Sequence, residues 1–489
     1  MLKFIPKLFP TIHILSRLGC IFSFFLLMPA IISYVYMDGL IKVHIISAIV
    51  AFVSSFISLI LTKPFKRELH TKDGFALAVG LWLCFAMVAA VPFYLSVPDI
   101  TVIDAFFEAM SGLTTTGATI IPSLDTLAPS LNFWRHLLNW LGGLGILILA
   151  VAILPMLGVG GMQLFRSEIS GINKGKKLAP RITQTAKSMW IIYIVFTIFI
   201  FLALKAAGMS WFDALCHAMS CIALGGFSTH NNSIAYFDSQ AIELILMFGM
   251  LLGAISFTNH FACFQNKSLK VYWKDLEVRS SAYILSICVI ASVIYLWKSD
   301  IYTLPESLRN VTFSFISIGT ACGYTTADFG QWPLTISLQM FLLANVLANS
   351  GSTGGGVKMI RVLVLMQFML REMMLLLHPH SVRTVKINGL NIPERTALTV
   401  IAFIFVYFFS VVLFTFIMMF MGFDFVSALS MVVSCITNTG PALGVASPAQ
   451  TSWIDFDVMT KIICSFIMLL GRLEVVTVFI LFTPAYWQK

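Results

Sequence analysis

Four short polar loops, each built around one glycine, are the residues of this chain whose type and spacing point to chemistry. Each loop follows a short helix-like run and lies between long apolar segments. The loops are Thr115-Thr116-Gly117-Ala118 (loop 1), Leu224-Gly225-Gly226-Phe227 (loop 2), Ala321-Cys322-Gly323-Tyr324 (loop 3) and Asn438-Thr439-Gly440-Pro441 (loop 4). Backbone carbonyls from four re-entrant loops can ring one axis and replace the hydration shell of a small cation. The pattern predicts a cation pore.

The fourfold occurrence is what separates a pore from ordinary turns. A single loop of this kind is more often a helix connection, but irregular backbone at membrane depth is tolerated only where it is buried in protein or lines a watery cavity. Four loops in matching positions therefore indicate one shared cavity. Glycine suits them because it adopts backbone conformations that other residues avoid, so that its carbonyl can turn toward the axis.

The short segments before the loops repeat with a regular spacing. Segments 104–113 and 213–223 both begin with Asp-Ala, and the loop glycine follows thirteen residues after Asp104 and after Asp213. Repeated spacing indicates internal duplication. We expect these aspartates to cap short helices, whose partly negative C-terminal ends then favour a cation at the loop. The third and fourth copies look looser, beginning near Pro305-Glu306 and at Asp424, sixteen residues before Gly440.

Composition sets the protein class. Apolar residues make up 58% of the 489 and charged residues 11%, and the mean hydropathy is strongly positive, which is typical of an integral membrane protein in a lipid bilayer. The net charge of +9 does not indicate nucleic-acid binding, because the basic residues lie in short connectors between apolar segments. The nine cysteines show no metal-ligand spacing and are interpreted as small hydrophobic residues.

Ten apolar stretches are long enough to cross a bilayer, which takes about 20 residues each. They are 17–37, 43–62, 74–97, 134–157, 188–208, 240–262, 281–298, 334–377, 397–421 and 456–483. We expect an all-α polytopic membrane protein with an extra N-terminal helix pair followed by four helix–pore-loop–helix repeats around one central pore. The predicted units are 1–72 (N-terminal helix pair), 73–165, 188–265, 281–377 and 397–489 (pore repeats 1 to 4).

Charge asymmetry predicts the topology. Connectors 63–72, 158–187, 263–280 and 378–396 are rich in Lys and Arg, whereas 98–133, 227–240 and 440–455 contain neither. Because basic connectors stay on the cytoplasmic side, both termini are expected in the cytoplasm.

The chain resembles the Trk/Ktr/HKT superfamily of potassium transporters, and its resemblance to the bacterial TrkH-type membrane subunit of that superfamily is close. The resemblance covers essentially the whole chain and rests on Thr114-Thr115-Thr116-Gly117-Ala118-Thr119, Leu224-Gly225-Gly226-Phe227-Ser228-Thr229, Ser350-Gly351-Ser352-Thr353-Gly354-Gly355-Gly356-Val357-Lys358, Gly471-Arg472-Leu473-Glu474 and Leu481-Phe482-Thr483-Pro484. It implies the same four repeats and extra helix pair as the segment count.

The resemblance also implies which groups bind potassium. The carbonyls of each loop glycine and the two residues before it would face the ion: Thr115, Thr116, Gly117, Leu224, Gly225, Gly226, Ala321, Cys322, Gly323, Asn438, Thr439 and Gly440. Glycine in loop 1 goes with potassium selectivity in this family. Only loop 1 has threonine two places before its glycine, so we expect potassium preference without strict exclusion of sodium.

A polar break in segment 334–377 is the candidate gate. Residues 345–356 are small and polar in mid-membrane, must be sheltered from lipid, and are made deformable by their glycines. The expected gate residues are Ser350, Gly351, Ser352, Thr353, Gly354, Gly355, Gly356, Lys358 and Arg472. A kinked helix packed through small residues is the alternative. The phosphate-binding pattern GxxxxGK[ST] is absent, so nucleotide binding is not indicated.

Arg472 lies within the last apolar stretch, where a charge costs roughly 3 kcal/mol or more unless it meets water or a partner. The alternative to a pore role is an ion pair with Glu474 or another buried acid, although residues two apart do not share a helix face. The resemblance places this arginine in the pore below the filter. Lys358 is expected to anchor the gate loop, or simply to extend toward the membrane surface.

The sequence thus predicts potassium uptake across the bacterial cytoplasmic membrane through a gated, filter-lined pore, as the membrane subunit of a Trk-type system. The resemblance implies a homodimer and a cytoplasmic nucleotide-binding regulatory ring. A proton- or sodium-coupled symporter is the alternative, disfavoured by the scarcity of membrane acids. An enzyme is not expected, because neither HExxH nor GxSxG occurs and His136 and His217 stand alone.

Overall fold

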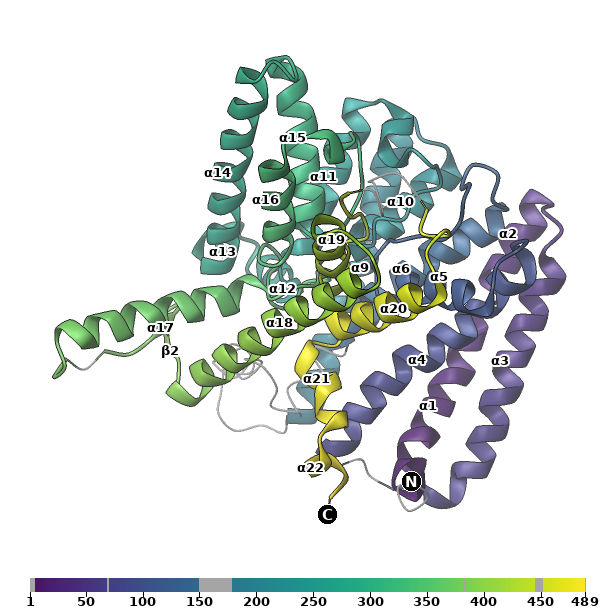
Figure 1. Cartoon of the computed structure of the whole chain (residues 1–489). Coiled ribbons are helices and arrows are strands. Elements are labelled where there is room, and N and C mark those ends of the chain that lie inside the picture. Colours follow the sequence, from purple (N-terminus) through teal and green to yellow (C-terminus); the bar gives the residue numbers. More distant parts are fainter. Residues whose placement is uncertain (1–4, 68–69, 149–177, 382, 445–451, 489) are drawn as a thin grey trace.

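The computed structural model describes residues 5–67, 70–148, 178–381, 383–444 and 452–488, and within them the chain is almost entirely helical (Figure 1). Helices dominate because a helix satisfies its own backbone polar groups, which lipid cannot do. Three helices precede the repeats: α1 (Ile5–Phe25), α2 (Met28–Tyr36) and α3 (Ile41–Thr62). α1 packs along α3, where the Ser16 hydroxyl donates to Ser58 Oγ at 2.8 Å. α1 and α2 together form one candidate span and α3 lies in the next, so these helices are the extra N-terminal pair.

Each of the four repeats has a long outer helix, a short buried helix, a glycine loop and a further helix. The elements are α4 (Thr71–Ser96), α5 (Val102–Leu113) and α6 (Pro129–Ile148); α9 (Leu178–Ala206), α10 (Trp211–Ala223), α11 (Gln240–Ala254) and α12 (Phe257–Asn266); α14 (Leu276–Lys298), α15 (Leu304–Gly319), α16 (Leu334–Ala344) and α17 (Met359–Leu377); and α18 (Glu394–Phe420), α19 (Phe425–Thr437), α20 (Val458–Arg472) and α21 (Val475–Phe479). The predicted fold class is confirmed.

Shorter elements connect the repeats. They are α13 (Lys270–Lys274), α22 (Pro484–Trp487), the 3-10 turns η1 (Lys63–Phe65), η3 (Ser233–Phe237), η4 (Phe329–Gln331) and η5 (Ile480–Phe482), and a two-stranded antiparallel hairpin of β1 (Lys386–Ile387) and β2 (Leu390–Asn391). In the hairpin, Lys386 pairs with Asn391 and Ile387 with Leu390. α17 and the start of α18 extend away from the bundle at the left of Figure 1, and both ends of the chain lie at its bottom.

The short buried helices α5, α10, α15 and α19 are hereafter the pore helices, and their packing closes a ring. The helix that follows each loop contacts the pore helix of the next repeat: α6 contacts α10, α11 contacts α15, α16 contacts α19, and α20 contacts α5. The last contact returns to the first repeat, so the four repeats surround one axis.

Two of the expected straight crossings are bent. Segment 240–262 turns by 96° between α11 and α12, and segment 456–483 turns by 113° between α20 and α21. Within the described residues, six helices are long and apolar enough to span a membrane, or eight if each bent pair is one span. The predicted end of crossing 134–157, the boundary at 165 and most of connector 158–187 lie outside the described residues. The predicted unit boundaries remain predictions.

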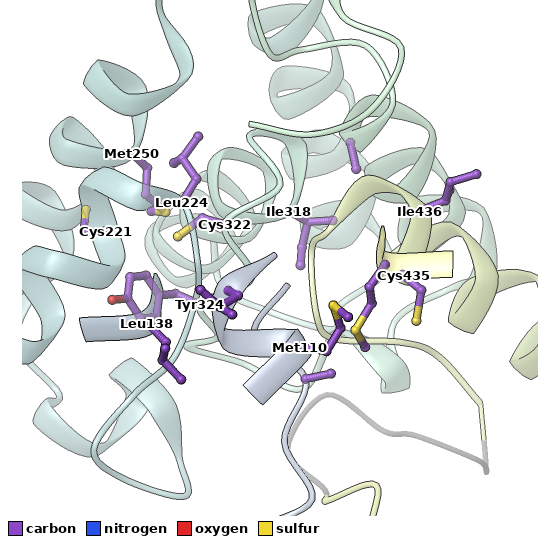
Figure 2. Packing of buried hydrophobic residues seen from close by; sticks show 14 of the residues in the cluster. Met110, Leu138, Cys221, Leu224, Met250, Ile318, Cys322, Tyr324, Cys435 and Ile436 are labelled. Atoms are coloured by element: carbon purple, nitrogen blue, oxygen red, sulfur yellow. The ribbon is translucent and has the colours of Figure 1, made fainter. Parts of the chain in front are cut away.

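Side chains from all four pore helices form one buried core. Figure 2 shows Met110 of α5, Cys221 of α10, Ile318 of α15 and Cys435 of α19 within the same cluster. All nine cysteines are free thiols, and five are buried. Their expected role as small hydrophobic residues fits this packing.

Candidate functional site

Polar caps fix the point where each pore helix begins. The Thr101 hydroxyl accepts from the Asp104 amide at 3.2 Å, and Asp104 Oδ2 accepts from the Thr101 amide at 2.8 Å. On α10, Ser210 Oγ accepts from the Asp213 amide at 3.0 Å and donates to the Asp213 carboxylate. The prediction that Asp104 and Asp213 are the caps is therefore wrong. Each is the third helical residue and reaches back to a Ser or Thr cap.

Counted from the cap, the fourth copy is as regular as the first two. The pairs of cap and loop glycine are Thr101 and Gly117, Ser210 and Gly226, Thr303 and Gly323, and Asp424 and Gly440. They are 16 residues apart in copies 1, 2 and 4 and 20 apart in copy 3. The four additional residues make about one further helical turn, since α15 has 16 residues and the others 12 or 13. Only the third copy departs from the pattern.

The four loops share one backbone conformation. The residue two places before each glycine is left-handed, with φ between 55° and 61° at Thr115, Leu224, Ala321 and Asn438. The loop glycines have φ between 66° and 96°, a region that other residues rarely adopt. A hydrogen bond that also recurs fixes this shape: the amide before each glycine donates at 2.9 Å to the carbonyl of a serine six places before the glycine. These serines are Ser111, Ser220, Ser317 and Ser434.

Sequence analysis missed those serines, although a signal for them exists. When the chain is aligned on its four loop glycines, a serine falls six positions before every one. The bond holds the amide of each loop against its own pore helix. The carbonyls of the same loop are not used in this bond and are left available for another partner.

The loop carbonyls have no hydrogen-bond donor within the part of the chain that the structure describes. Among the described residues, no hydrogen bond is recorded to the carbonyl oxygen of any of the twelve predicted ion-facing residues. Ten of the twelve residues are nonetheless buried, with Thr116, Cys322 and Thr439 fully inaccessible, while Gly117 and Gly226 are half-buried. Because more than about 90% of buried backbone carbonyls in proteins are paired, so many unpaired ones at one place indicate a partner from outside the chain.

The loops meet in a closed ring around the glycines. A Cβ built on Gly117 would lie 2.4 Å from Gly225 O, on Gly226 2.1 Å from Cys322 O, on Gly323 1.9 Å from Thr439 O, and on Gly440 2.5 Å from Thr116 O. Each glycine therefore faces the carbonyl of the next loop, in the order 1, 2, 3, 4 and back to 1. No side chain fits at any of the four positions, so the ring can be built only with glycine.

A cavity of about 260 Å³ lies over the ring and is lined by all four loop glycines. Its walls also include Arg135, His230 and Trp453. Arg135 is buried and forms an ion pair with Glu108 at 2.6 Å, and its guanidinium stacks over Phe227 at 4.0 Å from the ring centroid. The ring thus opens into a polar vestibule whose charged walls sequence analysis did not single out.

Side chains tie loop 4 to loop 1 and make the ring asymmetric. Asn438 Nδ2 donates to Thr116 Oγ1 at 3.0 Å and to Met468 O on α20 at 2.9 Å. The other loops have no residue of this kind at the same position, where they carry threonine, leucine and alanine. The four loops therefore share a backbone but not a set of supporting side chains.

Residues 345–358, here called the intramembrane loop, separate α16 from α17 and contain no helix. The alternative of a kinked helix is therefore wrong. The Thr353 hydroxyl lies 3.0 Å from Ile222 O, at the end of pore helix α10, and 3.2 Å from Gly253 O. Gly355 lies against the end of α19, since a Cβ there would be 2.1 Å from Thr437 O. The loop thus contacts the inner ends of the pore helices, on the side of the ring opposite the vestibule.

Several elements hold the intramembrane loop in place. The Asn349 amide donates to Ala254 O at 3.0 Å, and the Phe257 amide donates to Gly351 O at 3.1 Å. These two bonds use backbone groups that the bend between α11 and α12 exposes. The Ser350 amide donates to the Glu277 carboxylate of α14 at 2.8 Å. Such bonds explain why segment 240–262 is not one straight helix.

Arg472 bridges the intramembrane loop to repeat 1. It is the last residue of α20 and is 3% exposed. Its guanidinium donates to Thr353 O at 2.9 Å and to Gly142 O on α6 at 2.8 Å. The alternative of an ion pair with Glu474 is wrong, because Glu474 pairs with Arg361 at 2.7 Å.

The remaining predicted residues have clear positions. Lys358 is half-buried and is the cap residue of α17, with φ of 72°; its role as an anchor remains a prediction. His136 contacts Asn132 O and Phe227 O, and His217 contacts Asp213 O and Ser228 Oγ. Both histidines support loop 2 from behind, as packed residues would.

Comparisons with known proteins all find the same family, over nearly the whole chain. The family model TrkH, described as a cation transport protein, matches residues 41–489. A Trk system potassium uptake protein TrkH of Halomonas elongata is 42% identical over 98% of this chain and 99% of its own length. The protein of that name in Escherichia coli K12 is 38% identical over 98% and 99%. The crystal structure of the potassium transporter TrkH from Vibrio parahaemolyticus superposes with a TM-score of 0.90 at 37% identity, covering 98% of this chain and 99% of that one.

Proposed function

Because this chain belongs to the TrkH family of cation transport proteins, we propose that its four loops bind dehydrated potassium ions as they pass through the membrane. The protein is a multi-pass membrane protein of potassium uptake, as its near full-length relatives are named. The proposal concerns how its residues perform that uptake.

The unpaired carbonyls carry the proposal. The twelve loop carbonyl oxygens are without a hydrogen-bond donor among the described residues, ten of the twelve residues are buried, and the loops adjoin one another in a closed ring. Carbonyl dipoles at such a site replace the water that an ion loses on entry. The pore helices add to this effect, because their partly negative C-terminal ends lead into the loops.

We propose that the intramembrane loop is the gate and that Arg472 holds it closed. The loop lies against the inner ends of the pore helices, and Arg472 ties it to α6 through two charge-assisted hydrogen bonds. A positive charge on the conduction path also lowers the local concentration of cations. Release of the arginine would free the loop and remove that charge.

Assembly and location are proposed from the family resemblance and the charge pattern. We propose a homodimer in the bacterial cytoplasmic membrane, with both termini in the cytoplasm and with a nucleotide-binding regulatory ring on the basic connectors. The two ends of the chain lie at one end of the molecule (Figure 1), which agrees with this topology. Positive connectors on one side follow the usual rule for membrane insertion.

Coupled symport is not favoured. A coupling ion or proton would need membrane acids that are free to change partners. Glu108 pairs with Arg135, Glu243 with Arg309 and Glu474 with Arg361, each at 2.6 to 2.7 Å. These acids are held by fixed cations and suit a structural role.

The proposal is tested by rubidium tracer uptake into liposomes that contain the purified protein. Uptake should be driven by the membrane potential alone, and potassium should compete with rubidium at lower concentration than sodium does. Equal competition by sodium, or uptake that requires a proton gradient, would contradict it.

A further inference from the structure

An apolar cavity of about 630 Å³ lies away from the filter, between α9, α11, α12, α13 and α14. Its walls include Phe196, Phe199, Phe248, Leu252 and Phe264. This volume is within the range of about 300–1,000 Å³ that is usual for small-molecule sites. Phe199 and Phe248 are about half exposed on a face where α9 and α14 qualify as membrane spans. The cavity therefore opens toward lipid.

The rim of this cavity is basic and aromatic. Arg279 lines it, and Lys267, Lys270 and Lys274 are exposed on the adjoining connector. Trp273, also in the wall, is 70% exposed, as is common where a protein meets the membrane interface.

The acids of the same connector do not cancel this charge. Asp275 accepts from the Asn259 side chain and from the Glu277 amide at 2.7 Å, and Glu277 accepts from the Ser350 amide at 2.8 Å. Glu277 is also only 5% exposed. Both carboxylates face donors of the protein, and the four basic residues of the connector, Lys267, Lys270, Lys274 and Arg279, outnumber these two acids, which leaves the exposed rim positive.

We propose that the cavity binds an anionic phospholipid, with an acyl chain among the phenylalanines and the headgroup phosphate at Lys274 and Arg279. An apolar pocket beside exposed cations fits this ligand and disfavours a zwitterionic one. Each basic residue near a membrane surface strengthens the binding of anionic lipid by about fivefold.

The walls of the cavity are also joined to the intramembrane loop by hydrogen bonds. The effect of lipid on transport that we infer from this connection rests on the proposed gate. Leu252 and Ile255 of the cavity wall flank the bend whose carbonyls, Gly253 O and Ala254 O, accept from Thr353 and Asn349. On the opposite wall, Glu277 next to Val278 accepts from Ser350. A lipid that moves either wall therefore moves partners of the loop.

Binding is tested by native mass spectrometry of the purified protein titrated with phosphatidylglycerol or phosphatidylcholine. Phosphatidylglycerol should bind more tightly, and the double variant Lys274→Gln with Arg279→Gln should weaken its binding by about 25-fold, the product of two fivefold effects. The matched control Lys66→Gln with Arg395→Gln removes two exposed charges from other basic connectors and should change binding less than twofold.

A cavity-filling variant separates a lipid in the cavity from lipid or protein elsewhere on the basic surface. Ala282→Phe adds a ring inside the wall without altering charge and should weaken phosphatidylglycerol binding by tenfold or more. Equal binding of the two lipids, equal effects of the two double variants, or full binding by Ala282→Phe would each overturn the site.

Rubidium flux tests the link to the gate separately. Wild-type flux should differ at least threefold between phosphatidylcholine vesicles with and without phosphatidylglycerol, and the Lys274, Arg279 double variant should lose this difference. Flux that is equal in both vesicles despite intact lipid binding would overturn the link alone. Absence of rubidium flux in every vesicle would instead count against the proposed function.

Discussion

The filter ring and the intramembrane loop lie next to each other but are built on opposite principles. The ring repeats one backbone shape four times, with a left-handed residue, a glycine and a bonded serine carbonyl at the same positions in each copy. The intramembrane loop of repeat 3 has no second copy among the residues that the structure describes, and it is held by side chains of Thr353, Glu277 and Arg472 in addition to its backbone bonds. Repetition of backbone suits a function that must not change, whereas single side-chain contacts suit one that must switch.

Glycine has a different use in the two regions. In the ring, Gly323 is required because the next carbonyl occupies the space of a side chain. In the intramembrane loop, Gly355 has the same close contact with Thr437 O, but its neighbours can be exchanged for others if the loop moves. The comparison predicts that ring variants abolish transport and loop variants alter its control.

The largest effect is expected from Gly323→Ala. The added carbon would lie 1.9 Å from Thr439 O and displace that carbonyl. In enzymes, the loss of one preorganised hydrogen-bond donor from an oxyanion hole lowers the reaction rate by about 100- to 1,000-fold. Potassium flux into liposomes should fall by at least about 100-fold. Gly208→Ala is the matched control, because Gly208 also has positive φ, at 104°, but nothing within 4 Å of its Cβ position. Equal losses in the two variants would mean that backbone strain, not the ring, is responsible.

Arg472→Gln should act in the opposite direction. A hydrogen bond to a charged group contributes about 1.5–3 kcal/mol, so loss of the bonds to Thr353 O and Gly142 O should raise flux by at least about tenfold. Arg472→Lys keeps the charge with a different geometry and should raise flux less. Lower flux in folded Arg472→Gln protein would contradict the gate assignment, with folding checked by size-exclusion chromatography.

Thr353→Val should have a smaller effect of the same sign. It removes the hydroxyl contacts with Ile222 O and Gly253 O while keeping the side-chain volume. A neutral hydrogen bond contributes about 0.5–1.5 kcal/mol. Flux should rise about two- to tenfold without a change in the ratio of potassium to sodium permeability. A changed permeability ratio would instead place Thr353 in the filter.

The smallest effect is expected from Thr101→Ala, which removes the cap of α5. Loss of a Ser or Thr cap costs about 1 kcal/mol of stability, so the unfolding temperature should fall by a few degrees. Ser54→Ala is a control on a lipid-facing helix position, with one local bond to Ala51 O, and should change it less. A loss of selectivity in Thr101→Ala would show that the pore helix, and not only the loop, sets ion preference.

Much of the filter could be predicted because it depends on local sequence. The loop glycines and the short helices before them repeat along the chain, so alignment alone finds them. The different length of the third copy is visible in the sequence. The regularity of the fourth copy is hidden when residues are counted from the aspartate and not from the cap, because Asp424 is itself a cap.

The contacts around the gate could not be predicted because they join distant segments. Nothing near Glu474 in the sequence indicates its pairing with Arg361, more than 100 residues earlier. The bend between α11 and α12 likewise arises because Ala254 O bonds to Asn349, while its own sequence reads as one apolar helix. Burial of charge in the membrane identified Arg472 as important, but only tertiary structure gave its partners.

The most direct test of the account is the reversal potential of purified protein in a planar bilayer, with a potassium gradient at fixed sodium and at two values of pH. Passive flow of potassium through the carbonyl ring should give a reversal that follows the potassium gradient and does not move with pH. A reversal that shifts with pH or sodium in fixed proportion would contradict it, because ion coupling would then replace passive flow through the carbonyl ring.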